Sequence, residues 1–314
     1  MSRKTLIVIT GPTGSGKSDT AVELAQRVGA EIISADSRQI YRGIPIGTAA
    51  PTPAQRRAVP HHFVDMLELD EYYSAAQFEA DAIALLDRLF SASDYVVMCG
   101  GSMLYVDAVC KGIDNIPTIS DAVRAAVVDD WHRAGDEAML DELRRLDPEY
   151  YERVDRKNMK RVLHAVEICR QSGTTYTSLR TNSAKQRPFR IVKTEMSLPR
   201  DVLFDRINRR VEKMVEAGLV DEARRVYPLR HLNSLNTVGY KEMFAMFDGV
   251  WDLPTAVARI QKNTRVYAKK QMTWFARDAE IRRFAPGDVD GILSTCTVEN
   301  LNAAISNISP HFPL

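Results

Sequence analysis

The chain has 314 residues, of which 45% are hydrophobic and 26% charged. This composition is typical of a globular protein with two domains, or with one α/β domain that carries an insertion. No apolar run approaches the roughly 18 residues of a membrane span, and the four cysteines form no CxxC pair. The sequence therefore argues against a membrane protein, a zinc site and a disulfide framework. The net charge of +1 excludes no class of partner.

The first third of the chain alternates between apolar strand-like runs and amphipathic helical patterns. The runs predict strands at residues 5–9, 31–35, 62–67 and 95–99. Helical spacing predicts helices at residues 18–28, 75–90 and 103–109. The segment 41–60 is rich in glycine and proline and is typical of a long loop. This alternation predicts an α/β fold, a parallel sheet flanked by helices as in P-loop NTPases.

The middle of the chain has a different pattern. Residues 121–172 show only helical periodicity, and a strand pattern returns at 189–198. We therefore expect an all-helical insertion domain at 113–188 within an α/β catalytic core formed by 1–112 and 189–314. In the last part of the core we expect helices at 201–216, 220–227 and 253–277, a strand at 281–284 and a helix from Val298.

A phosphate-binding loop is the strongest motif. Gly11-Pro12-Thr13-Gly14-Ser15-Gly16-Lys17-Ser18 fits G-x4-G-K-[ST] and lies between a predicted strand and a predicted helix. In such loops, backbone N–H groups and the helix N-terminus converge on phosphate oxygens. Lys17 supplies a charge, and Ser18 supplies a hydroxyl for Mg²⁺. The motif predicts a bound phosphate without specifying the reaction.

The carboxylate that usually holds Mg²⁺ in nucleotide hydrolases is missing from its expected place. The strand 95–99 ends in Gly100-Gly101-Ser102, and Asp94 precedes the strand, at the wrong end of the sheet. The sequence therefore favours a small transferase over a motor or a switch protein.

Asp36 follows the second predicted strand, at the sheet edge where α/β proteins bind ligands. Its carboxylate is a candidate to bind Mg²⁺ or to accept a proton from an incoming nucleophile. An aspartate at a strand end also commonly stabilises a turn through its own side chain. Beside the phosphate loop we favour the functional interpretation.

Seven segments in order resemble the tRNA dimethylallyltransferases, also called tRNA isopentenyltransferases. Besides the phosphate loop they are Ile33-Ser-Ala-Asp-Ser-Arg-Gln-Ile-Tyr41, Ile46-Gly-Thr-Ala49, Val59-Pro-His-His-Phe63, Gly100-Gly-Ser-Met-Leu-Tyr105, Val238-Gly-Tyr-Lys-Glu242 and Thr264-Arg-Val-Tyr-Ala-Lys-Lys-Gln-Met-Thr-Trp-Phe275. The sequence lacks a C-terminal zinc finger, as the bacterial type does.

The resemblance implies transfer of a dimethylallyl group from dimethylallyl diphosphate to N6 of the adenosine 3′ of the tRNA anticodon, position 37, with release of diphosphate. It implies that residues 11–18 hold the donor, that Ser18 binds Mg²⁺, and that Asp36, Ser18 and Arg210 are catalytic. The adenine amine is a poor nucleophile, so Asp36 would orient it and take its proton. The implied tRNA contacts are Asp36, Ser37, Arg38, Gln39, Ser102, Arg124, Lys160, Arg161, Val162, Leu163, His164, Asn236, Thr237, Val238, Gly239, Tyr240 and Lys241.

Two basic stretches, at 156–170 and 259–283, are either solvated helix faces or a site for a polyanion. With tRNA as the implied partner we favour the polyanion site. The chain departs from the family pattern at Ala50 and His164, where relatives commonly carry Lys and Arg, and at Asn236, where an Arg is sometimes seen. These departures should weaken contacts with the RNA backbone.

Three other functions remain open from the sequence. They are a small-molecule kinase that uses ATP, an adenylate isopentenyltransferase that acts on free nucleotide, and an RNA-binding module without catalysis. The helical insertion and the basic stretches favour a large acceptor, tRNA with its anticodon stem-loop. We expect a monomer that acts in the cytoplasm, with no membrane contact.

Overall fold

The computed structural model describes residues 4–181 and 184–296. The chain divides into two units by its internal contacts. The core unit comprises Met1–Cys110 and Arg187–Leu314, and the inserted unit comprises Lys111–Gln186. The helix expected from Val298 lies outside the described residues. No described helix is both long and apolar enough to cross a bilayer.

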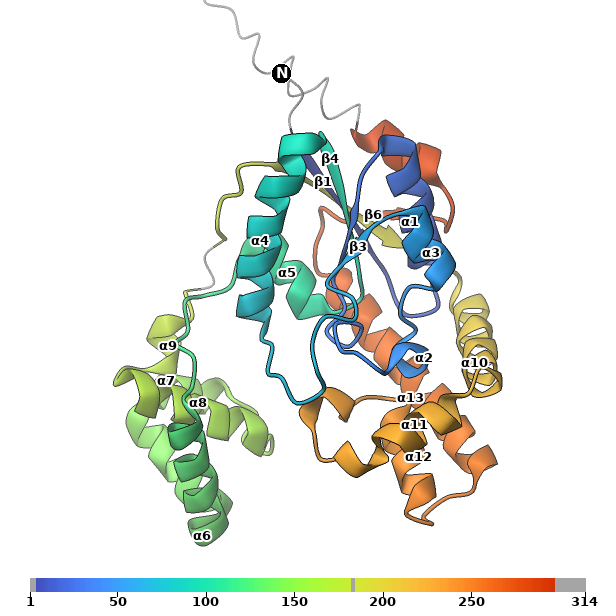
Figure 1. The fold of residues 1–314 in the computed structure, drawn as a ribbon. Helices are drawn as coiled ribbons and strands as arrows, with labels where there is room; N and C mark the ends of the chain where they lie inside the picture. Colours follow the sequence, from blue (N-terminus) through green and yellow to red (C-terminus); the bar gives the residue numbers. More distant parts are fainter. Residues whose placement is uncertain (1–3, 182–183, 297–314) are drawn as a thin grey trace, which may run out of the picture. The chain divides into compact units, whose positions relative to one another are not determined.

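The core unit is built on a parallel sheet, as the sequence predicts (Figure 1). Its strand order is β3-β2-β4-β1-β5-β6. The strands are β1 (Thr5–Thr10), β2 (Ile32–Ser34), β3 (His61–His62), β4 (Tyr95–Cys99), β5 (Arg190–Met196) and β6 (Arg282–Phe284). Because β1, β2 and β4 lie side by side and parallel, the loops that follow them meet at one edge of the sheet.

Helices cover both faces of the sheet. Alternate residues of β1 point to opposite faces: Leu6 and Val8 pack in one apolar cluster with α4 (Ala75–Ala92) and α5 (Met103–Lys111). Ile7 and Ile9 pack in a second cluster with α1 (Lys17–Val28). A central strand that is buried on both faces consists almost entirely of apolar residues, and such an apolar run can be recognised in the sequence.

The remaining helices of the core unit lie beyond the carboxyl edge of the sheet or flank it (Figure 1). They are α2 (Pro45–Thr48), α3 (Pro53–Ala58), α10 (Arg200–Glu216), α11 (Leu219–Val226), α12 (Tyr240–Phe247) and α13 (Leu253–Phe275), with 3₁₀ turns η1 (Tyr227–Leu229) and η2 (Asn233–Leu235). A third apolar cluster joins α10, α11, α12 and α13 to the segment after β2, through residues such as Ile44, Leu219 and Tyr240.

The inserted unit is helical. It contains α6 (Asp121–Leu146), α7 (Pro148–Arg153), α8 (Met159–Ser172) and α9 (Tyr176–Leu179). Its apolar core is formed mainly by α6 and α8, with Val127, Leu143 and Val166 fully buried. Gly135 interrupts α6 with a φ of 82°, which kinks the helix.

Two expectations about local structure are wrong, and one helix is missed. The segment 41–60 is not one long loop, because it contains α2 and α3; Thr52 and Gln55 form a capping box that starts α3. The strand expected at 62–67 is limited to β3. It ends there because Phe63 and Asp65 have positive φ angles, which lie outside the range that a β-strand adopts. Helix α12 was not expected from the sequence.

Candidate functional site

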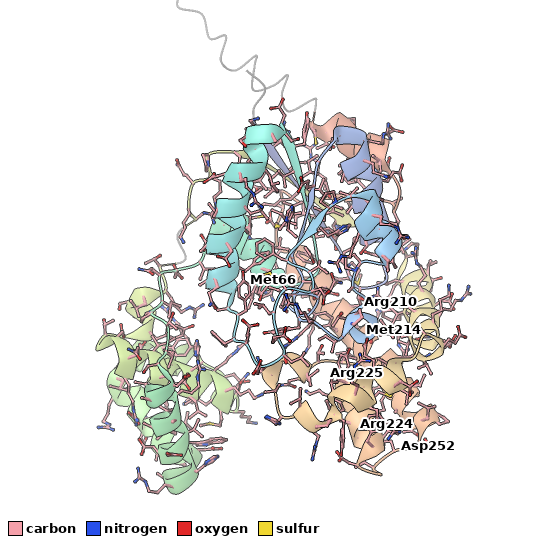
Figure 2. The ribbon with its side chains drawn as sticks, in the orientation of Figure 1. Met66, Arg210, Met214, Arg224, Arg225 and Asp252 are labelled. Carbon is pink, nitrogen blue, oxygen red and sulfur yellow. The ribbon has the colours of Figure 1, made fainter. Side chains whose placement is uncertain are left out.

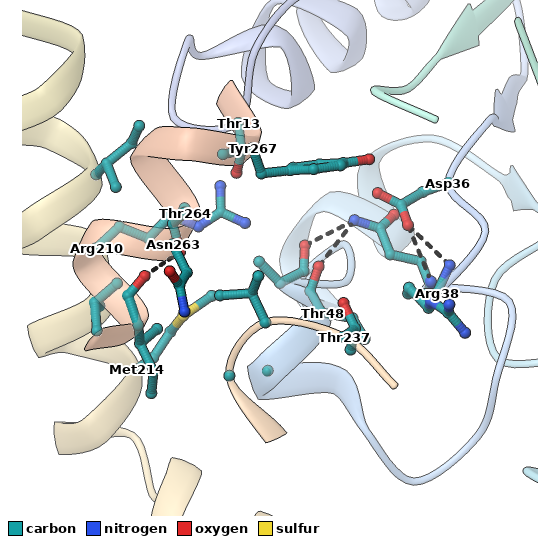
Figure 3. Close-up of a pocket in the computed structure, with 18 of the residues that line it drawn as sticks. Thr13, Asp36, Arg38, Thr48, Arg210, Met214, Thr237, Asn263, Thr264 and Tyr267 are labelled. Atoms are coloured by element: carbon teal, nitrogen blue, oxygen red, sulfur yellow. Dashed lines mark hydrogen bonds between the residues drawn. The ribbon is translucent and has the colours of Figure 1, made fainter. Parts of the chain in front are cut away.

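A pocket of about 610 Å³ lies at the carboxyl edge of the sheet. The phosphate loop after β1, the Asp36 segment after β2, and Ser102 after β4 line it, together with residues of α2, α10 and α13. Figure 3 shows Asp36 and Arg210 on different sides of this pocket, with Tyr267 between them. The sheet topology therefore brings together the motifs that the sequence keeps apart.

The phosphate loop has the backbone needed to bind an anion. Gly14 and Gly16 have φ angles of 83° and 88°, a region that other residues rarely adopt. Gly16 is the N-cap of α1, so the helix starts at Lys17. The exposed amides and the positive end of the helix dipole therefore face the pocket.

Two cations of the pocket have no partner of opposite charge within ion-pair distance in the described part of the chain. Neither Lys17 nor Arg210 forms an ion pair among residues 4–181 and 184–296. Burial lowers the pKa of Lys17, and Arg210 adds to this effect while Cys99 and Asp36 oppose it. Burial also lowers the pKa of Arg210. Partly buried cations without a partner of opposite charge are costly, so this pair suits a bound anion.

Asp36 serves the local turn and the pocket together. Its Oδ1 accepts hydrogen bonds from the backbone N–H groups of Arg38 at 2.9 Å and Gln39 at 3.4 Å. Its Oδ2 accepts no hydrogen bond from the described residues, and the residue lines the pocket. Both interpretations of Asp36 are therefore compatible, because one oxygen holds the turn and the other is available to a ligand.

The neighbours of Asp36 are held by further hydrogen bonds. The hydroxyl of Ser102 accepts from the backbone N–H of Ser37 at 2.9 Å. The guanidinium of Arg38 donates to the carbonyl oxygens of Asn233 at 2.8 Å and Ser234 at 3.1 Å. Ser102 and Arg38 thus fix the side of the pocket on which Asp36 lies.

Gln271 is a pocket residue whose role the sequence did not reveal. Its side chain is buried; Oε1 accepts from the Thr13 N–H at 2.9 Å, and Nε2 donates to the Gly101 carbonyl at 2.8 Å. It connects α13 to the phosphate loop and to the loop after β4. A signal was present, because Gln271 lies with the buried Ala268 and Phe275 on one stripe of α13. A glutamine in an apolar stripe needs hydrogen-bond partners.

The other residues of the core unit that were expected to contact tRNA differ in whether they line the pocket. Asn236, Thr237, Val238, Gly239 and Lys241 line the pocket. Tyr240 does not, because its side chain is fully buried in the apolar cluster beneath.

In the inserted unit, the expected RNA contacts also differ in exposure. Lys160, Arg161 and His164 are exposed on α8, and Arg124 lies 4.0 Å from Glu167. Val162 and Leu163 instead pack in the core of the unit, because α8 is amphipathic and these two residues lie on its apolar face. Their side chains are therefore not available to an RNA.

The basic stretches are only partly free for a polyanion. In α8, Arg170 pairs with Asp130 at 2.8 Å and with Glu142 at 2.7 Å. In α13, Lys269 lies over the ring of Phe204, whereas Lys270 lines the pocket. Phe275 is buried in the core.

No group of three His, Cys, Asp or Glu side chains suited to a metal occurs in the described part of the chain. Asp94 pairs with Lys4 at 2.9 Å, at the amino end of β4, away from the phosphate loop. Among the described residues the pocket thus gathers cations for a phosphate group without a hydrolase-type carboxylate after β4. The fold and the site define a P-loop transferase.

The chain belongs to the IPP transferase family, whose model matches residues 39–278. It is 54% identical over 297 residues to tRNA dimethylallyltransferase 1 of Bacteroides thetaiotaomicron, covering 95% of this chain and 96% of that one. It is 55% identical over 282 residues to tRNA dimethylallyltransferase 1 of Phocaeicola vulgatus, with 90% and 94% covered. The expected family, its bacterial type and the class of enzyme are confirmed.

Solved structures agree with this assignment. The tRNA isopentenylpyrophosphate transferase of Bacillus halodurans superposes with a TM-score of 0.68 at 35% identity, over 95% of this chain and 96% of that chain. A eukaryotic dimethylallyltransferase acting on tRNA superposes with a TM-score of 0.80 over 98% and 81%. At 23% identity, the second likeness shows the fold alone. The predicted α/β fold is confirmed.

Proposed function

We propose that this enzyme transfers a dimethylallyl group from dimethylallyl diphosphate to N6 of adenosine 37 in the anticodon stem-loop of tRNA. The observation that carries the proposal is the pairing, in one pocket, of an anion site with an available carboxylate. The anion site consists of the phosphate-loop amides, Lys17 and Arg210. The carboxylate is Asp36.

The anion site serves the leaving group. When the bond between C1 of the allyl group and the diphosphate oxygen breaks, its electron pair goes to the diphosphate, and an allylic cation develops. Lys17, Arg210, the Ser18 hydroxyl and the loop amides stabilise the growing negative charge. These groups are fixed before the reaction, which is the source of their catalytic effect.

Asp36 serves the acceptor. The N6 lone pair forms a bond to C1, and N6 then loses a proton, which the free oxygen of Asp36 accepts. A hydrogen bond from N6 to this oxygen also orients the amine beforehand. Asp36, Ser18 and Arg210 are the catalytic residues in this proposal.

The site fits a magnesium ion. Ser18 is exposed beside the phosphate loop and lines the pocket, so its hydroxyl and the diphosphate oxygens of the donor are available as ligands. Ser18 would hold Mg²⁺, which when bound neutralises charge on the diphosphate.

The acceptor requires RNA contacts from both units. Arg124, Lys160, Arg161 and His164 of the inserted unit carry charge or hydrogen-bond donors for the RNA backbone. In the core unit, Ser37, Arg38, Gln39, Ser102, Asn236–Gly239 and Lys241 are the proposed contacts around the adenine. The base has to leave the anticodon stack to reach Asp36. We propose that the inserted unit is an RNA-binding domain and that the enzyme acts as a monomer in the cytoplasm.

A calorimetric comparison separates this function from a kinase. Dimethylallyl diphosphate with Mg²⁺ should bind the wild-type protein, and Lys17→Ala should weaken that binding because a phosphate contact is lost. Tight binding of ATP with no affinity for the prenyl donor would support the kinase instead.

A transfer assay separates this function from an adenylate isopentenyltransferase. Transfer to free adenosine nucleotide but not to tRNA would support an adenylate isopentenyltransferase.

A further inference from the structure

A buried carboxylate on α11 holds the short helix α2. Glu222 is 3% exposed, and its carboxylate accepts hydrogen bonds from the backbone N–H groups of Ile46 at 2.9 Å and Gly47 at 2.7 Å. The hydroxyl of Tyr240 donates to the same carboxylate at 2.5 Å. Three donors on one buried carboxylate offset much of the cost of its burial. Glu222 and Tyr240 therefore form a specific clamp on α2, here called the α2 clamp.

Tyr240 fits closely against α2. Its hydroxyl also lies 3.2 Å from the carbonyl oxygen of Ile44, the N-cap residue of α2. A Cβ atom at Gly47 would lie 2.5 Å from atoms of the tyrosine ring, closer than real contacts allow. Position 47 therefore needs glycine as long as Tyr240 occupies this place. The clamp is a packed contact as well as a set of hydrogen bonds.

A chain of hydrogen bonds leads from α2 to Asp36. The carbonyl oxygens of Thr48 and Ala49 accept from Gln39 Nε2 at 3.3 Å and 3.0 Å. Gln39 Oε1 accepts from the Ser34 hydroxyl at 3.1 Å, and the Gln39 N–H donates to Asp36 Oδ1 at 3.4 Å. The position of α2 thus sets the position of Gln39, and Gln39 helps to hold the Asp36 carboxylate.

Helix α2 also contributes to two pockets. Gly47, Thr48 and Ala49 line the catalytic pocket, whereas Pro45 and Ile46 line a second pocket of about 960 Å³. Arg210 and Met214, which are labelled in Figure 2 and lie one turn apart on α10, line both pockets. A displacement of α2 would therefore move a wall of the catalytic pocket as well as Gln39.

We propose that Glu222 and Tyr240 are positioning residues that act through α2 and Gln39 to hold Asp36 where it accepts the proton of the acceptor amine. This inference rests on the proposed function. Proton acceptance depends on the direction of one oxygen, and a misplacement of about 1 Å can cost on the order of 100-fold in rate. The groups proposed to hold the diphosphate lie on other elements, in the loop between β1 and α1, at the start of α1 and on α10, so we expect them to keep their positions when the clamp is lost.

The test is Tyr240→Phe, which removes the hydroxyl but keeps the ring against Gly47. We expect kcat to fall about tenfold while the affinity for dimethylallyl diphosphate stays unchanged. The matched control is Tyr227→Phe, because this tyrosine packs against the same apolar cluster but its hydroxyl donates to Asp248 and not to α2. An unchanged kcat in Tyr240→Phe, or an equal loss of kcat and donor affinity, overturns the proposal.

A double-mutant cycle with Gln39→Met tests the path. If the clamp acts through Gln39, adding Tyr240→Phe to Gln39→Met should lower kcat no further; additive losses overturn the path. Hydrogen exchange supplies a readout that does not need activity. Tyr240→Phe should speed exchange at the amides of Ile46, Gly47, Arg38 and Gln39. Inactive wild-type protein would refute the proposed function, whereas unchanged exchange at Arg38 and Gln39 would refute the clamp.

Discussion

At the scale of single residues, the two oxygens of Asp36 have different roles, one in the turn and one as the proposed proton acceptor, and these roles can be separated by mutation. Asp36→Asn keeps a carbonyl oxygen for the N–H groups of Arg38 and Gln39, so the turn should survive. The amide cannot take a proton, and kcat should fall by roughly 10²–10⁴-fold with donor affinity nearly intact. Steady-state kinetics and donor titration check this. Wild-type turnover in the variant would refute the general base, and Asp70→Asn, at an exposed position, is the control.

The lowered pKa of Lys17 leads to a prediction of how donor binding depends on pH. Only the protonated amine attracts the diphosphate, and burial lowers the pKa of Lys17 below its usual 10.5. In the free protein the charge is therefore lost at a lower pH than for an exposed lysine, and donor affinity should decline as pH rises. Calorimetry at about pH 7 and about pH 9.5 measures this. Lys17→Met should bind more weakly and lose this pH dependence; an equal decline in the variant would assign the effect elsewhere.

The sequence predicts those site residues whose role is encoded locally. The phosphate loop and Asp36 can be recognised because a strand, a turn and a helix follow one another within a few positions. Gln271 and Glu222 cannot be recognised in this way. Gln271 contacts Thr13 across 258 positions, and Glu222 contacts Gly47 across 175. Partners so distant are defined only by the folded chain.

At the scale of elements, α13 is joined to the phosphate loop by the two hydrogen bonds of Gln271. Gln271→Met keeps the volume but leaves the Thr13 N–H and the Gly101 carbonyl without this partner. Unsatisfied buried groups cost about 1–3 kcal/mol each, so we expect a lower free energy of unfolding and weaker donor binding. Denaturant unfolding and donor titration measure the two effects. The control is Gln261→Met on the same helix, because the native Gln261 side chain donates hydrogen bonds to Asn208 and Glu212 of α10. An equal loss of stability and donor affinity in this control would contradict a special role for Gln271.

Elements with a strong hydrophobic period were predicted well, and short elements were not. Strand β4 and helix α1 are where apolar runs and helical spacing place them. Helix α2 has four residues, too few for a period, and its place depends on Glu222 and Tyr240. The strand expected at 62–67 ends early because its backbone turns at Phe63, which an apolar pattern does not reveal.

At the scale of the whole molecule, the exposed cations of α8 predict how the enzyme depends on salt. Replacing Lys160 and Arg161 together by glutamine should weaken tRNA binding and reduce the slope of log K against log salt by about 0.7–0.9 per lost phosphate contact. Donor binding should not change, because the residues that line the catalytic pocket in the described part of the chain all belong to the core unit. Filter binding over a salt series measures the slope. Arg133→Gln, which removes a cation paired with Asp130, is the control; unchanged tRNA affinity in the double variant would remove α8 from the interface.

The central claim is that the enzyme moves a dimethylallyl group onto a tRNA adenosine. The most direct measurement is incubation with labelled dimethylallyl diphosphate and unmodified tRNA, followed by nucleoside analysis. We predict label on N6 of the adenosine 3′ of the anticodon, one diphosphate released per group transferred, and product formation slowed by roughly 10²–10⁴-fold with Asp36→Asn. Label on free nucleotide but not on tRNA, or donor bound without any transfer, would contradict the account.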